Sequence, residues 1–446
     1  RHYDGGTMTA ASDAARPNLV DRVLGIERHE YVAVAWSFFY FFCVLSAYYI
    51  LRPVRETMGV GSGTNTLPYL FMASFTIMLL ATPVFGWIAS RFPRKVFLPW
   101  VYGFFIVNIL VFWAVFSQRI DDGLDHVWLG RTFFVWLSVF NLYVVSVFWS
   151  FMADIYTREQ GRRLFGLLSS GGSIGALLGG IATSILVTRI GFENLFPISA
   201  LLLAFAVVCI RQLRRWATQE HSTETGDNDT SAKLLGGGAL SGMTHARGSR
   251  YFQAIIWSSI IASLLGTALY YFRNELVATS ITGEDLRTQF FSNINVATSF
   301  LTIIGQMLLV RLVVRRFGIG VALSIMPFLS VICFAWVALD PTLIVVAFAE
   351  IARRATGFTF SKPSTDMLYS VVTPEEKYKT KNFIDTTVYR FGDVIGIWVI
   401  RVSMTAGMSV VSLFLVPFAL VWGMIALWLG RTYRRKARKL RESGIA

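Results

Sequence analysis

Long apolar stretches alternate with short polar ones along most of the chain. A hydrocarbon core about 30 Å thick needs roughly 20 helical residues, so each apolar stretch is long enough to cross a membrane as one helix. The pattern predicts about twelve such spans, at residues 30–51, 66–90, 96–117, 127–152, 164–188, 194–213, 251–272, 290–312, 319–339, 342–362, 382–405 and 409–430. We therefore expect an all-α integral membrane protein.

The composition agrees with this pattern, because 54% of the 446 residues are hydrophobic and only 15% are charged. A soluble domain carries about 25% charged residues, so a single water-soluble core is excluded. The longest polar gap contains a triple glycine at 236–238 and predicts a flexible linker between two six-helix halves. The expected divisions are 1–29 (a tag remnant followed by an N-terminal tail), 30–213, 214–250 (the linker), 251–430 and 431–446 (a basic tail).

The basic residues behind the net charge of +14 indicate which parts of the chain face the cytoplasm. Cytoplasmic loops of membrane proteins carry an excess of Lys and Arg. With both termini in the cytoplasm, most of the 41 basic residues fall on that side, together with the linker and the basic tail, whereas Arg273 and a few others fall at or beyond the opposite face. Nucleic acid is not expected as a partner, because no folded soluble domain displays the basic residues.

Several kinds of chemistry are excluded by missing motifs. No Gly-x-x-x-x-Gly-Lys-Ser/Thr loop is present, so the chain contains no ATPase motor of that type. All five histidines fall outside the predicted spans, which argues against an intramembrane metal site or a histidine proton relay. The three cysteines lie inside apolar stretches and are expected to be buried small hydrophobic residues. We expect neither enzymatic activity nor a cofactor or metal.

Two pairs of segments echo each other between the halves. Residues 86–95 resemble the loop signature of the major facilitator superfamily, and Arg315–Gly318 stand at the equivalent place in the second half. Any tight cytoplasmic turn tends to be basic, so a plain loop is the alternative. The second pair, Ser170–Gly175 and Phe391–Gly396, places small residues in spans five and eleven, where they let helices approach closely. Together these echoes favour a major facilitator-type carrier with two pseudo-symmetric six-helix halves.

Charged residues at membrane depth are costly and usually functional. In span ten, Glu350 precedes Arg353 by three residues and Arg354 by four, so it can pair with either on one helix face. In span eleven, Arg390 and Asp393 are three residues apart and lie at a similar depth. The two groups predict the polar lining of a cavity, with a structural salt-bridge cluster that locks the two helices as the alternative.

The end of the first span offers further candidates. Pro53 is expected to interrupt that helix and free backbone groups. Arg52 and Arg55 would then line the outer part of a path, with Tyr48 and Tyr49 available for stacking. An interfacial anchor of aromatic and basic side chains is the alternative reading.

The type of basic residue favours an anionic substrate, because the guanidinium fork suits phosphate or carboxylate and stays charged when buried. The substrate-binding candidates are Arg353, Arg354, Arg390, Arg52, Arg55, Tyr48, Tyr49 and Lys362. The candidates for coupling or gating are Glu350, Asp393, Asp385 and Asp154.

Three segments resemble the ATP:ADP antiporter family of bacteria and plastids. They are Leu51–Glu56, similar to Leu-Arg-x-x-Lys-Asp; Pro363–Tyr369, similar to Asp-Pro-x-Lys-Glu-Met-Ala-Tyr; and Glu375–Gly392, similar to Lys-x-Lys-Gly-Lys-x-x-Ile/Val-Asp followed by Arg-x-Gly. The family's acidic residue in helix seven has no counterpart near 269–271, and Asp393 stands where neutral or basic residues are usual. The resemblance implies a divergent bacterial member with major facilitator-like architecture and, for authentic members, exchange of adenine nucleotides.

The expected function is secondary active transport of an organic anion, such as a nucleotide or another phosphorylated metabolite, across the bacterial inner membrane by alternating access. A proton-coupled importer or exporter of another amphipathic solute, such as a metal-chelating metabolite, is the alternative. A receptor or scaffold is a third reading, which the short loops disfavour. The expected partners are a small anionic substrate and the lipid bilayer, and the carrier is expected to be monomeric.

Overall fold

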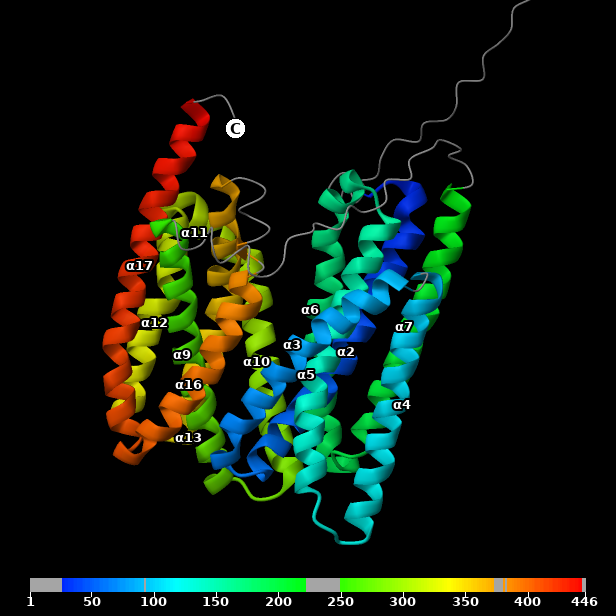
Figure 1. The fold of residues 1–446 in the computed structure, drawn as a ribbon, viewed down its shortest axis with the longest axis horizontal. Helices are drawn as coiled ribbons and strands as arrows, with labels where there is room; N and C mark the ends of the chain where they lie inside the picture. Colours follow the sequence, from blue (N-terminus) through cyan, green and yellow to red (C-terminus); the bar gives the residue numbers. More distant parts are fainter. Residues whose placement is uncertain (1–25, 92–93, 222–248, 373–379, 382, 443–446) are drawn as a thin grey trace, which may run out of the picture.

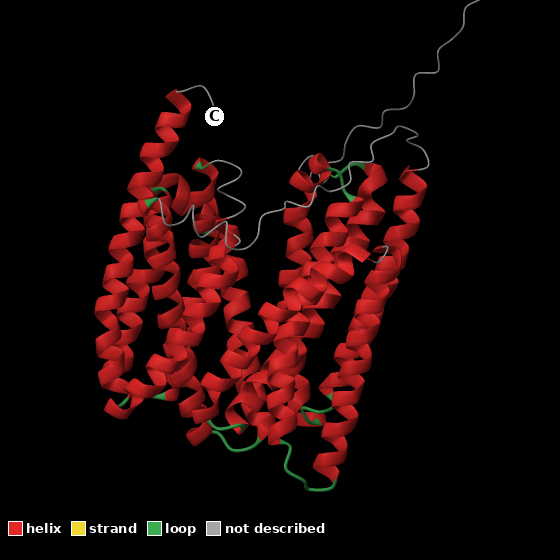
Figure 2. Ribbon diagram, viewed as in Figure 1, coloured by secondary structure: helices red, strands yellow, loops and turns green. Residues whose placement is uncertain are grey.

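The computed structural model describes residues 26–91, 94–221, 249–372, 380–381 and 383–442. Every regular element in this part of the chain is helical, and Figure 2 shows helices joined by short loops. The predicted all-α fold is therefore confirmed. Residues 1–25 and 222–248, which include most of the predicted tail and linker, lie outside the described residues.

The helices form two bundles that follow the order of the chain (Figure 1). The first bundle contains α2 (Tyr31–Gly61), α3 (Leu67–Arg91), α4 (Arg94–Asp121), α5 (Val127–Ile155), α6 (Arg158–Ile190) and α7 (Leu195–His221). The second contains α9 (Arg250–Ser280), α10 (Glu284–Leu308), α11 (Val310–Phe317), α12 (Ile319–Leu339), α13 (Leu343–Thr356), η3 (Gly357–Ser361), α14 (Lys362–Leu368), η5 (Ile384–Val388), α16 (Tyr389–Ser403) and α17 (Met408–Glu442). Short 3₁₀ turns are η1 (Arg28–Glu30), η2 (Thr64–Thr66), η4 (Tyr369–Val371) and η6 (Met404–Ala406).

Nine of the described helices are long and apolar enough to cross a membrane, or ten when α10 and α11, bent by 49° at their junction, count as one span. The described residues of each of the twelve predicted spans nevertheless fall largely within helices. The spans at 342–362 and 382–405 coincide with helices interrupted by the π-helical segments η3 and η5. The count of twelve stays a prediction. Helix α7 also continues to His221, and α17 to Glu442, past the spans predicted there.

The small residues that echo between the halves pack in the same way. In the first bundle Gly175 of this echo and Gly179, four residues further along α6, lie against α2, and a Cβ added at Gly179 would stand 2.7 Å from the Ser46 carbonyl oxygen. In the second bundle Gly392 and Gly396 lie against α9, with an added Cβ at Gly396 3.4 Å from Leu264. Helix α6 therefore packs on α2 as α16 packs on α9. Residues 92–93 of the first basic loop lie outside the described part of the chain.

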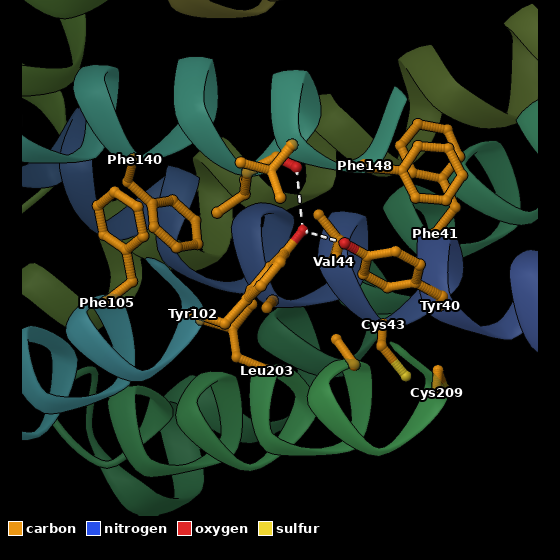
Figure 3. Packing of buried hydrophobic residues seen from close by; sticks show 14 of the residues in the cluster. Tyr40, Phe41, Cys43, Val44, Tyr102, Phe105, Phe140, Phe148, Leu203 and Cys209 are labelled. Carbon is orange, nitrogen blue, oxygen red and sulfur yellow. Dashed lines mark hydrogen bonds between the residues drawn. The ribbon is translucent and has the colours of Figure 1, made fainter. Parts of the chain in front are cut away.

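The core of the first bundle is aromatic (Figure 3). The Tyr40 hydroxyl donates to the Tyr102 hydroxyl at 2.6 Å, and Tyr102 donates to the Val144 carbonyl at 3.1 Å, so both buried hydroxyls have partners. Phe41 and Phe148 stack with ring centroids 4.1 Å apart. The three cysteines of the chain are free and buried, as expected from their apolar surroundings.

One face of α10 joins the two bundles at the end of the molecule opposite the tip of α17 (Figure 1). We call this row of polar contacts the seam. Its members on α10 recur at positions that share one helix face. The bonds are His126 Nε2 with Glu284 Oε1 (2.8 Å), the Phe192 amide to Asp285 Oδ1 (2.9 Å), Thr57 with Thr288 (2.7 Å), Gln289 to the Ser184 carbonyl (2.9 Å), Ser292 to the Gly180 carbonyl (2.7 Å) and Ser184 to Asn293 Oδ1 (2.5 Å).

Candidate functional site

A cavity of about 310 Å³ lies between the two bundles. The first bundle lines it from α2, α3 and α5, and the second from α9, α10, α13, η3 and α16. Its charged lining residues are Arg52, Arg55, Glu56, Arg273, Glu350, Arg353, Arg354, Arg390 and Asp393. Among the described residues the lining thus combines six arginines with three carboxylates, an excess of three positive charges when all are ionised.

Arg273 of α9, one of the charged lining residues, bridges two carboxylates. Its Nη2 lies 2.9 Å from Glu56 Oε2 of α2, and its Nη1 lies 2.7 Å from Glu350 Oε1 of α13. The guanidinium also stacks over the Tyr270 and Phe291 rings, 4.7 Å from each centroid. This bridge joins the two bundles. The assignment of Arg273 to the outer face was wrong, because α9 continues to Ser280 and the side chain is only 3% exposed.

On α2, Arg55 and Arg52 differ in their partners. Arg55 donates to Glu56 at 2.9 Å and to the Phe134 carbonyl at 3.1 Å, and its guanidinium lies 3.8 Å from the Phe134 ring centroid. Arg52 donates to the Tyr49 hydroxyl at 3.3 Å. The predicted break at Pro53 is absent, since α2 is continuous through it. A proline removes one backbone bond, and helices packed closely by their neighbours tolerate that loss.

Consecutive arginines of α13 face different walls of the cavity. Arg353 donates to the Ala262 carbonyl of α9 and lies beside Gly266, where an added Cβ would stand 2.8 Å from its Nη1. Arg354 turns to α10 and donates to Asn295 Oδ1 at 2.9 Å. Of the two, only Arg354 pairs with Glu350, at 3.4 Å. Of the two pairings predicted for Glu350 along the helix, the one with Arg354, four positions away, is thus the one that forms.

Arg52 and Arg353 have no carboxylate within 4.0 Å among the described residues. Arg353 is buried, and its Nε finds no hydrogen-bond partner there. A buried charge without a counter-ion is expensive, because its desolvation is not compensated. The lining therefore contains positive charge that the described protein atoms do not neutralise.

The pair on α16 completes the lining. Arg390 Nη1 lies 3.7 Å from Asp393 Oδ2, and the Ser263 hydroxyl of α9 donates to Asp393 Oδ1 at 2.5 Å. The Arg390 side chain is 48% exposed, so it reaches open space, whereas Asp393 is held against α9. The two charged groups predicted at one depth in spans ten and eleven therefore line the same cavity.

Residues 132–397 match the sequence pattern of the Major Facilitator Superfamily. The chain belongs to this superfamily of membrane transporters. It is a multi-pass secondary transporter. The predicted fold class, that of a major facilitator-type carrier, is thereby confirmed.

Individual relatives agree with this membership. The transporter is 20% identical over 467 aligned positions to "ADP,ATP carrier protein 2" of Chlamydia pneumoniae, covering 87% of this chain and 86% of that one. The resemblance to the nucleotide carriers is thereby confirmed. Among solved structures, a POT family transporter matches with a TM-score of 0.61 at 12% identity, covering 90% of this chain and 96% of that one. The nucleoside transporter NupG matches with a TM-score of 0.56 at 15% identity, covering 90% and 99%. These two likenesses concern the fold.

Several predicted site residues of the transporter are not part of the cavity lining. Tyr48 and Tyr49 contact each other, with ring centroids 5.4 Å apart. The Lys362 ammonium lies 3.7 Å from Asp366, with the side chain half exposed. Asp154 is exposed at the end of α5, and the side chain of Asp385 lies outside the described part of the chain.

Two contributors were missed or left open by the sequence. Arg273 follows the predicted end of its span by one residue, and only the length of α9 brings it inside the transporter. Asn295 is a neutral polar residue within the predicted span 290–312, where a side chain of this kind can equally form an interhelical hydrogen bond. No local signal separates it from Asn293, which faces the seam.

Proposed function

We propose that this transporter carries an organic anion, in the class of nucleotides and other phosphorylated metabolites. The excess of three positive charges around one cavity supports this most directly. Arginine forks bind phosphate and carboxylate through paired charge-assisted hydrogen bonds. An anion in the cavity would supply the counter-charge that Arg353 and Arg52 lack among the described residues.

Two observations support a phosphorylated anion: the similarity to a named carrier, and the aromatic residues that line the cavity. The similarity to a protein named as an ADP,ATP carrier favours a phosphorylated substrate. The aromatic residues Phe358 and Tyr389 also line the cavity, and they are 47% and 42% exposed. Exposed aromatic faces beside arginines suit a solute that has a planar part and an anionic part.

The proposed cycle is alternating access across the bacterial inner membrane, with both termini in the cytoplasm. In this arrangement the seam closes the outer side. Figure 1 shows the bundles diverging toward the tip of α17, which would be the cytoplasmic side. Opening to the outside would require the seam and the Glu56–Arg273 bond between the bundles to part.

Counterflow in liposomes tests this proposal. The purified full chain is reconstituted with ATP, ADP, inorganic phosphate or a neutral nucleoside inside, and uptake of the labelled solute is followed with and without a pH gradient. We expect uptake that requires an internal anion and fails with the nucleoside. Uptake driven by the pH gradient alone would instead support the proton-coupled alternative, with Asp393 as the cavity carboxylate that is not held by Arg273.

A further inference from the structure

Asn295 is the neutral member of the cavity's polar lining that belongs to the seam helix α10. It is 3% exposed and faces Arg354, whose Nη2 lies 2.9 Å from the amide oxygen. Two residues earlier on the same helix, Asn293 faces the seam and accepts from Ser184. Asn295 therefore lines the cavity from the same helix that carries the seam.

The chemistry of its partner fixes the orientation of the amide. A guanidinium group has five N–H donors and no acceptor, so only the oxygen of Asn295 can face Arg354. The amide nitrogen, with two N–H donors, is then turned away from the arginine. No other hydrogen bond of this side chain occurs among the described residues. A buried polar group of this kind normally has a partner, and the cavity is the space left for one.

The residue type also matters. An aspartate at this position would hold Arg354 more tightly as an ion pair, but it would cancel the charge of the arginine. An asparagine orients Arg354 through a neutral acceptor and leaves the positive charge in place. It also adds donors of its own, which a carboxylate lacks.

We propose that Arg354 and Asn295 form one oxyanion-binding unit, in which the guanidinium supplies charge and the Asn295 amide nitrogen donates to the same phosphate or carboxylate group. This inference rests on the proposed function, since it names a contact for the same substrate. It also brings the substrate into direct contact with α10, the helix that carries the seam.

The test compares two substitutions on α10 in the purified full chain. Asn295→Asp keeps the shape and replaces the donors by a carboxylate beside Arg354. Asn293→Asp adds the same charge two residues away, outside the cavity lining. Binding of ATP, ADP and inorganic phosphate is measured by ligand-induced thermal stabilisation, and the KM and maximal rate of counterflow are measured in liposomes.

We expect Asn295→Asp to raise the Kd and the KM for the bound anion at least tenfold, with the melting temperature of the free protein within a few degrees of wild type. Asn293→Asp should leave the Kd within about twofold, whereas its counterflow rate is free to change because Asn293 belongs to the seam. Asn295→Ala, which removes the donors without adding charge, should fall between them, and it decides the question if the aspartate variant does not fold.

The outcomes separate this inference from the proposed function. If no anion stabilises or is exchanged by the wild-type protein, the proposed function fails. If wild type binds an anion and both Asn295 variants bind it with unchanged Kd and KM, the Asn295 contact is overturned and Arg354 acts alone. Equal losses in the Asn293 and Asn295 aspartate variants would also overturn it, because a general charge effect on α10 would then suffice.

Discussion

The two bundles share a helix arrangement but divide the chemistry unequally. The first bundle buries a core of aromatic rings and contributes cavity charges from α2 alone. The second contributes charged lining residues from α9, α13 and α16. Both π-helical segments of the described chain also lie in the second bundle. π-Helical turns occur frequently at functional sites, so we propose that the second bundle supplies most of the binding site and that the first serves mainly for packing.

The largest effect that tests this division concerns the bridge between the bundles. Arg273→Ala leaves Glu56 and Glu350 buried without their shared partner. Removal of one partner from a buried ion pair costs about 3–5 kcal/mol. We expect a loss of this size in the free energy of unfolding, measured by denaturant titration in detergent. Arg438→Ala, which removes an exposed pair on α17, is the control and should change it by less than about 1 kcal/mol. An equal effect of the two variants would refute a special role for the bridge.

The next effect separates binding charges from structural ones. Arg353→Ala and Arg390→Ala remove cavity charges of the second bundle, and we expect each to weaken anion binding at least tenfold while the free protein stays folded. A lost charged hydrogen bond to a buried ligand typically costs about 2–5 kcal/mol. Lys362→Ala, outside the lining, should bind as wild type does. If both arginine variants are merely destabilised and still bind, the two arginines are structural and the binding site lies elsewhere.

A smaller effect compares the two glycine contacts. Gly179→Ala forces a Cβ to within 2.7 Å of a backbone oxygen, so one helix must shift, at a cost of about 1–3 kcal/mol. Gly396→Ala meets its neighbours at 3.4 Å and also gains helix propensity, so its free energy of unfolding should stay within about 1 kcal/mol of wild type. The same denaturant titration measures both. Equal costs would mean that the two bundles are packed equally tightly there.

The smallest effect is a pH dependence of the seam. Burial raises the pKa of Glu193, in the loop between α6 and α7, and nearby Asp285, Asp121 and Glu284 raise it further, against a backbone hydrogen bond that lowers it. If separation of the bundles exposes this carboxyl, closure takes up a proton. Its contribution to closure is then fully present below the ordinary glutamate pKa of about 4.3 and is lost as the pH rises through the raised value.

Spin labels at Gln118→Cys and Thr282→Cys, in a background without the native cysteines, measure the separation of the bundles at this end. We expect the open fraction to rise modestly from pH 4.5 to pH 7 and this rise to flatten in Glu193→Gln. Asp122→Asn is the matched control and should keep the wild-type profile. A flat profile in the wild-type background would show that Glu193 does not contribute to closure.

The sequence predicted the helical fold well, because apolar length is a local property. It also predicted Arg353, Arg354, Arg390 and Asp393 as neighbours, since helical spacing and depth suffice to place them together. It failed at Arg273, where about two further helical turns of α9 decide between the outer face and the cavity. It could not rank Asn295 above Asn293, because which face of α10 meets which helix depends on contacts between distant segments.

The polar character of the seam has a mechanical consequence. Its bonds exchange readily for bonds to water, so each contributes only about 0.5–1.5 kcal/mol net to holding the bundles together. The seam can therefore separate and re-form, because each hydrogen bond that breaks is replaced by hydrogen bonds to water. In the proposed cycle the seam opens one bond at a time, whereas the buried Glu56–Arg273 ion pair between the bundles has to part in a single, more costly step.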